Sequence, residues 1–97
     1  MMNETIAYKN GEWKPKSQVT IELGDRGFYL GDAVFDLFRT FDGNPFRIDD
    51  HVDRFFRSAQ FARLDPGVSR DEVIALTEEC VRLNEPLRKR FGDWSVW

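Results

Sequence analysis

Cysteine, histidine and long apolar runs are all scarce in this chain. The single cysteine, Cys80, excludes an internal disulfide and favours a reducing compartment. The polar N-terminus has no signal-peptide pattern, so a cytoplasmic location is predicted. One histidine, His51, leaves no second imidazole for a metal site, and no metal is predicted. No apolar run reaches the roughly 18 residues of a membrane span, and no membrane partner is expected.

An excess of basic residues is also missing. The chain has 14 basic and 17 acidic residues, a net charge of −3, and its basic residues are scattered. Nucleic acid is therefore not a predicted partner. Apolar side chains are plentiful, at 41% of the sequence with nine phenylalanines and three tryptophans. A chain of 97 residues with this composition is expected to form one domain with a core.

The most informative stretch is DRGFYLGDAVFDLFRTFDGNPFRIDDHVDRFFR, residues 25–57. It predicts glycine-containing turns and a β-hairpin that precedes a helix. The expected pieces are turns at 25–27 and 30–32, a strand over 33–41, a hairpin turn at 42–44 and a return strand at 46–48.

The predicted strand over 33–41 has two unlike faces. Alternation places Phe35, Leu37 and Arg39 on one face and Asp36 on the other, among apolar neighbours. One interpretation is a strand near a sheet edge whose charges reach solvent. The other is that Phe35, Leu37 and Arg39 line a pocket in which the arginine binds an anion.

The flanking segments predict further strands and two helices, and hence an α+β fold. A hairpin is expected over 5–14 around Asn10-Gly11, and a strand over 17–23. The first helix covers roughly 50–64, with Asp49 or Asp50 as N-cap and with Arg54 pointing away from its apolar stripe. The second begins at a capping box, Ser69 to Glu72, and runs to about Leu83 with Cys80 as a small apolar residue on its inner face. After it come a solvated basic connection at 88–90 and the start of a strand at 92–97.

An ordered set of motifs resembles a known family. The motifs are the DRGF turn, GDAVFD at 31–36, Arg39 at the strand end, G-x-x-F at 43–46 and H-x-x-R at 51–54. Together they resemble the N-terminal small domain of the fold-type IV, pyridoxal-phosphate-dependent transaminases. That family includes branched-chain and D-amino-acid aminotransferases, aminodeoxychorismate lyases and (R)-selective amine transaminases. The resemblance runs from Asn10 to Trp97 and implies an antiparallel, hairpin-rich sheet packed against two helices.

The resemblance implies roles for five residues. Arg54 matches the arginine that binds the phosphate of the cofactor, pyridoxal 5'-phosphate, and Phe35, Leu37 and Arg39 match positions on the substrate side of the pocket. Leu30 matches a position where branched-chain members carry a tyrosine that reaches the partner subunit's site. Two positions differ from the usual motif, which has glycine and glutamate where this chain has Ala33 and Asp36. The amino donor therefore stays open.

The resemblance also implies a larger enzyme. Its lysine, which bonds to the cofactor, belongs to a large domain and matches none of Lys9, Lys14, Lys16 and Lys89, so no catalytic residue is expected in residues 1–97. The complete protein would be a homodimer that moves an amino group between an amino acid or amine and a 2-keto acid, and the chain would end in mid-strand. The alternatives are part of an aminodeoxychorismate lyase, or a stand-alone remnant that is non-catalytic or binds a partner.

Overall fold

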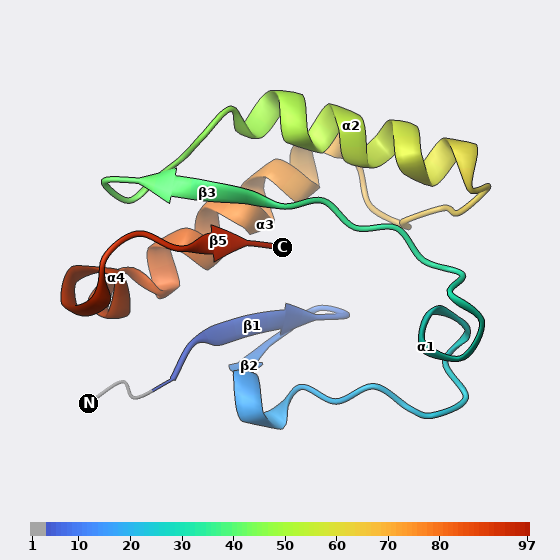
Figure 1. The fold of residues 1–97 in the computed structure, drawn as a ribbon, viewed down its shortest axis with the longest axis horizontal. Coiled ribbons are helices and arrows are strands. Elements are labelled where there is room, and N and C mark those ends of the chain that lie inside the picture. The colour runs from blue at the N-terminus through green and yellow to red at the C-terminus, as the bar shows by residue number, and fades with distance from the viewer. Residues whose placement is uncertain (1–3) are drawn as a thin grey trace.

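The computed structural model describes residues 4–97, which form two small antiparallel sheets and several helices (Figure 1). The α+β class is therefore confirmed. In chain order the elements are β1 Ile6–Lys9, β2 Glu12–Pro15, η1 Lys16–Gln18, α1 Arg26–Leu30, β3 Phe38–Phe41, β4 Asn44–Pro45, α2 Ile48–Phe61, α3 Arg70–Leu83, α4 Glu85–Phe91 and β5 Ser95–Val96.

The first sheet is the predicted N-terminal hairpin. Strands β1 and β2 pair antiparallel, with Tyr8 opposite Trp13 and their rings 4.9 Å apart. Asn10 and Gly11 have φ angles of 48° and 91°, the left-handed values that a tight two-residue hairpin turn requires. The prediction of a hairpin here is confirmed.

Asn84 fastens this hairpin to the helices. Its side-chain oxygen accepts from the Ile6 backbone N–H at 2.7 Å, and its amide nitrogen donates to the Ile6 and Cys80 carbonyls at 3.0 and 2.7 Å. Asn84 is only 4% exposed, so all of these bonds lie away from bulk water. The junction of α3 and α4 thus fixes β1 through one side chain. Cys80 is half-buried beside it, and burial raises the pKa of its thiol, as befits the predicted packing role.

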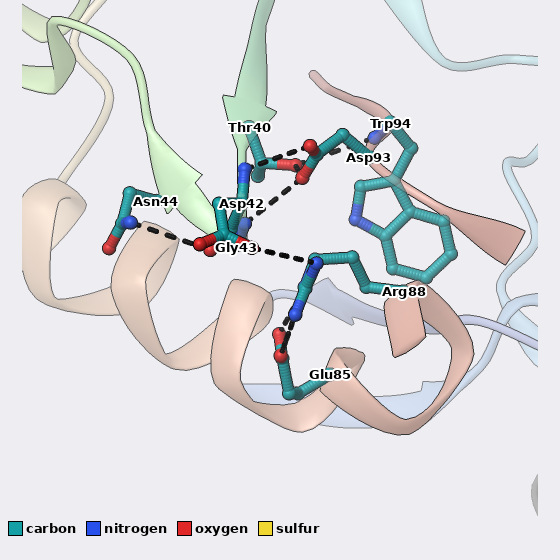
Figure 2. A network of polar contacts seen from close by, with 8 residues as sticks. All are labelled: Thr40, Asp42, Gly43, Asn44, Glu85, Arg88, Asp93 and Trp94. Carbon is teal, nitrogen blue, oxygen red and sulfur yellow. Dashed lines mark hydrogen bonds and ion pairs between the residues drawn. The ribbon is translucent and has the colours of Figure 1, made fainter. Parts of the chain in front are cut away.

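Asp93 stabilises the second sheet, whose strand order is β4-β3-β5. Its carboxylate accepts from the Thr40 hydroxyl at 2.8 Å and from the backbone N–H groups of Asp42 and Gly43 at 2.8 and 3.0 Å (Figure 2). The Gly43 N–H, the Thr40 hydroxyl and the Asp42 N–H together lower the pKa of Asp93 to about 2. The segment that leads into β5 is therefore tied to the β3–β4 turn, and the predicted strand near the end of the sequence is confirmed at Ser95–Val96.

Helix α3 forms the centre of the packing. It contacts α2, α4, β1 and β4. The predicted capping box is present, with the Ser69 hydroxyl accepting from the Glu72 N–H at 3.1 Å and the Glu72 carboxylate accepting from the Ser69 N–H. The buried apolar side chains among residues 4–97 all come from α2, α3 and α4: Val52, Ala59, Val81 and Leu87.

Three predictions about strands are wrong. Residues 17–23 form η1 and an irregular segment, with Leu23 80% exposed, because no neighbouring strand pairs with them. Only 38–41 of the strand predicted over 33–41 is a strand, because β4 and β5 reach no further along it. The return strand is β4 at Asn44–Pro45, and α2 already begins at Ile48.

Three other expectations differ from the structure: the turn at 25–27, the N-cap of the first long helix and the connection at 88–90. The turn at 25–27 starts α1, since the Asp25 carboxylate accepts from the Gly27 N–H at 2.8 Å and caps a short helix. The N-cap of α2 is Arg47, with φ 52°, while Asp49 and Asp50 lie in the first turn, where negative charge favours the helix dipole. Residues 88–90 belong to α4, whose Arg88 pairs with Glu85 at 2.6 Å.

The β3–β4 turn provides a test of this packing. Gly43 and Gly67 both have left-handed φ angles, 79° and 73°, but a Cβ at Gly43 would lie 2.8 Å from Arg88 Nε, whereas one at Gly67 would have open space. Gly67→Ala should cost about 1 kcal/mol of unfolding free energy through its backbone alone. Gly43→Ala should cost about 1 kcal/mol more, since its methyl group must displace the paired side chains of Arg88 and Glu85. Equal losses in urea unfolding of the two variants would contradict the close contact.

Candidate functional site

The carboxylate of Asp36 joins the segment before β3 to helix α2. Arg54 donates to it from Nε and Nη2, both at 2.7 Å, so the pair is bidentate. His51, one turn before Arg54, places Nδ1 2.9 Å from the same carboxylate. The Asp36 side chain is 10% exposed and that of Arg54 is 56% exposed. The Arg54 hydrogen bonds hold the pKa of Asp36 at about 2, against the opposing effect of burial and with further help from His51.

The contact with Asp36 indicates which tautomer of His51 is present. An ionised carboxylate only accepts hydrogen bonds, so the 2.9 Å contact assigns the proton of the imidazole to Nδ1. The 3.2 Å approach of Arg54 Nη2 to Nδ1 then joins two donors and is not a hydrogen bond. Of the five N–H bonds of Arg54, Asp36 takes two. The two N–H bonds of Nη1 have no hydrogen-bond partner among residues 4–97 and are available to an anion.

A groove of about 360 Å³ lies along the N-terminal half of α2. Its lining is mostly charged and consists of Phe46, Arg47, Asp50, His51, Asp53, Arg54 and Arg57. Arginine is suited to binding a phosphate because its planar guanidinium offers paired N–H donors and does not lose its proton. The groove can therefore hold an anion, with Arg54 as a fixed contact.

The predicted pocket residues lie on another surface. Residues 33–41 alternate between exposed and interior positions along their whole length, so Phe35, Leu37 and Arg39 do share one exposed face, opposite Asp36. Phe35 is 76% exposed, and the Arg39 guanidinium lies 5.2 Å from the Phe41 ring centroid. None of the three lines the groove beside α2, and Leu30 is exposed on α1. Their roles in a substrate pocket stay predictions.

Sequence reasoning did not identify Asp36 as the partner of Arg54. Two signals for it were present, a lone charge on the inner face of the predicted strand and the i,i+3 spacing of His51 and Arg54. The contact between Asp36 and Arg54 depends on how the segment before β3 packs on α2, which no local sequence pattern predicts.

The family model for class IV amino-transferases matches residues 33–91, more than half of the chain. The chain belongs to this family. A D-alanine aminotransferase of Staphylococcus haemolyticus is 32% identical over 80 residues, which are 82% of this chain and 28% of that protein. One from Staphylococcus aureus (strain N315) is 33% identical over 78 residues, 80% of this chain and 28% of its own length.

A third relative of the class IV chain has another activity in its name. The aminodeoxychorismate lyase of Bacillus subtilis (strain 168) is 30% identical over 80 residues, 82% of this chain and 27% of the lyase.

The chain spans about 28% of the length of the D-alanine aminotransferases that it matches. Among residues 4–97, no helix is long and apolar enough to cross a membrane.

The tautomer of His51 can be tested directly. In ¹⁵N NMR spectra of the chain, which has one histidine, the imidazole should be protonated at Nδ1 at neutral pH. Asp36→Ala removes the acceptor and should shift the proton toward Nε2, whereas Asp50→Ala removes a carboxylate of the same groove that does not touch His51. An Nε2–H tautomer in the unsubstituted chain would contradict the geometry described here.

Proposed function

We propose that this chain is the N-terminal small domain of a pyridoxal-phosphate-dependent enzyme and that Arg54 binds the phosphate of the cofactor. Class IV amino-transferases are a family of such enzymes. The observation that carries the proposal is the bidentate Asp36–Arg54 pair, which fixes the guanidinium beside an open groove and leaves the two N–H donors of Nη1 unused. Because the side chain is already held in place, little conformational entropy is lost when the phosphate binds.

The proposed reaction is the transfer of an amino group to a 2-keto acid. When bound, the cofactor would accept the amino group from the donor and pass it to the keto acid. Of the possible donors, D-amino acids come first, because the two relatives at 32% and 33% identity are named D-alanine aminotransferases. Lyase chemistry on aminodeoxychorismate is the second candidate, supported by the relative from Bacillus subtilis.

The lysine that bonds to the cofactor is proposed to lie outside these 97 residues. Lys9 and Lys14 belong to the N-terminal hairpin, where Lys14 pairs with Glu12 at 3.3 Å. Lys16 lies in η1, Lys89 is exposed on α4, and none of the four lines the groove beside α2. Other parts of the enzyme must therefore bring the reactive amine to the groove.

A homodimeric, cytoplasmic enzyme is part of the same proposal. Large apolar side chains are exposed on α1 and on the outer face of residues 33–41, including Phe28, Tyr29, Phe35 and Leu37. A surface of this kind is typical of one that other parts of a protein cover. The free thiol of Cys80 is in keeping with a reducing compartment.

Substitution of Arg54 tests the phosphate role. In the complete enzyme, Arg54→Ala should weaken cofactor affinity about ten- to a hundredfold, the usual effect of losing a charge-assisted hydrogen bond. Arg54→Lys should recover only part of this, since an ammonium group makes no two-pronged contact. Arg63→Ala, just beyond the end of the same helix, is the matched control. Cofactor retention during dialysis that is the same in Arg54→Ala and Arg63→Ala would show that the assignment is wrong.

Substitution of Arg39 tests the substrate side. If Arg39 binds the carboxylate of an amino-acid donor equally in the ground and transition states, Arg39→Ala should raise the KM for that donor about tenfold with less change in kcat. A donor amine of similar size without a carboxylate should be unaffected with the same keto acceptor. Equal losses for both donors would mean that Arg39 does not contact the donor's carboxylate.

A further inference from the structure

Helix α2 brings a second arginine, Arg57, into the groove one turn after Arg54. Residues three apart on a helix have Cβ atoms about 5–6 Å apart, so the two side chains start as neighbours. Like charges at this spacing destabilise a helix by themselves. A nearby negative charge would remove that penalty.

Two carboxylates of the groove region are committed to other arginines. Asp36 is occupied by Arg54. Asp50 accepts from Arg47 at 2.7 Å. Neither of these ion pairs includes Arg57.

Asp53 would be the natural partner of Arg57, since it lies four residues earlier on the same helix. It is bound instead by Arg70 at the start of α3, at 2.5 Å, and Arg70 also contacts Asp49 at 3.2 Å. In the part of the chain that the structure describes, residues 4–97, Arg57 has no carboxylate within the 4.0 Å of an ion pair. An exposed cation beside a second, partly unused guanidinium is thus left in the groove.

We infer that Arg57 is the second guanidinium of the anion subsite and contacts the phosphate monoester that Arg54 binds. This inference rests on the proposed function of Arg54. A phosphate dianion has enough oxygen atoms to accept from both side chains at once, and its charge would compensate both arginines. Arg70 has an indirect role as a positioning residue, because it holds the Asp53 carboxylate in an ion pair that does not include Arg57.

The test compares pyridoxal phosphate with pyridoxal, which lacks the phosphate, as ligands of the complete enzyme without its cofactor. Kd values are measured by absorbance titration for the parent, Arg57→Gln, Arg54→Ala and Arg63→Ala. Arg57→Gln should weaken binding of pyridoxal phosphate about three- to tenfold and leave pyridoxal binding unchanged, the effect expected for a charge-assisted contact at an exposed position. Arg63→Ala should change neither Kd.

The outcomes separate the inference from the proposed function. If Arg54→Ala reduces the preference for the phosphorylated ligand and Arg57→Gln does not, the role of Arg57 is overturned and that of Arg54 stands. If Arg57→Gln raises the Kd of both ligands by the same factor, its effect is structural and the inference is again overturned. If neither variant alters the preference for pyridoxal phosphate over pyridoxal, both the inference about Arg57 and the proposed function of Arg54 are overturned.

Arg70→Gln provides an independent check outside the groove. Releasing Asp53 should let its carboxylate pair with Arg57 and compete with the phosphate, so pyridoxal phosphate should bind more weakly while pyridoxal binds as before. Adding Asp53→Asn to Arg70→Gln should restore the affinity, because the competing charge is then gone. Weaker binding without this restoration would overturn the inference.

Discussion

The ion pair between Asp36 and Arg54 is the contact on which the arrangement of the site depends. Residues 33–37 have no strand partner, so no ladder of backbone hydrogen bonds fixes them. Their position on α2 relies instead on an inner carboxylate that accepts from Arg54 at 2.7 Å and approaches His51 at 2.9 Å. The same contact aims the guanidinium at the groove. One carboxylate thus serves both the packing of the fold and the geometry of the site.

Polar side chains join the other elements as well. Asn84 holds β1 against the α3–α4 junction, and Asp93 holds the β3–β4 turn against the segment that leads into β5. Single directional contacts of this kind matter in a structure where few apolar side chains are fully buried and many are exposed. The chain spans about 28% of the length of the D-alanine aminotransferases that it matches.

The two faces of residues 33–41 separate two tasks. The inner face carries Asp36, which accepts hydrogen bonds from Arg54, the arginine proposed to bind the cofactor. The outer face presents Phe35, Leu37 and Arg39. Neighbouring residues in the sequence thus contribute to opposite surfaces because alternation along an extended chain turns successive side chains by half a turn. A substrate pocket built on the outer face would share no side chain with the groove beside α2.

The sequence by itself determined the features that depend on neighbouring residues. The Asn10-Gly11 hairpin, the Ser69–Glu72 capping box and the alternation along 33–41 all follow from local backbone preferences and side-chain spacing. The motif order also gave the family. Only the tertiary structure decided which alternating segments became strands, because a strand needs a partner, and residues 17–23 have none. It also decided that Asp36 meets Arg54 and that Asp53 pairs with Arg70 rather than Arg57, since these contacts join residues 17 or 18 positions apart and depend on how separate elements pack.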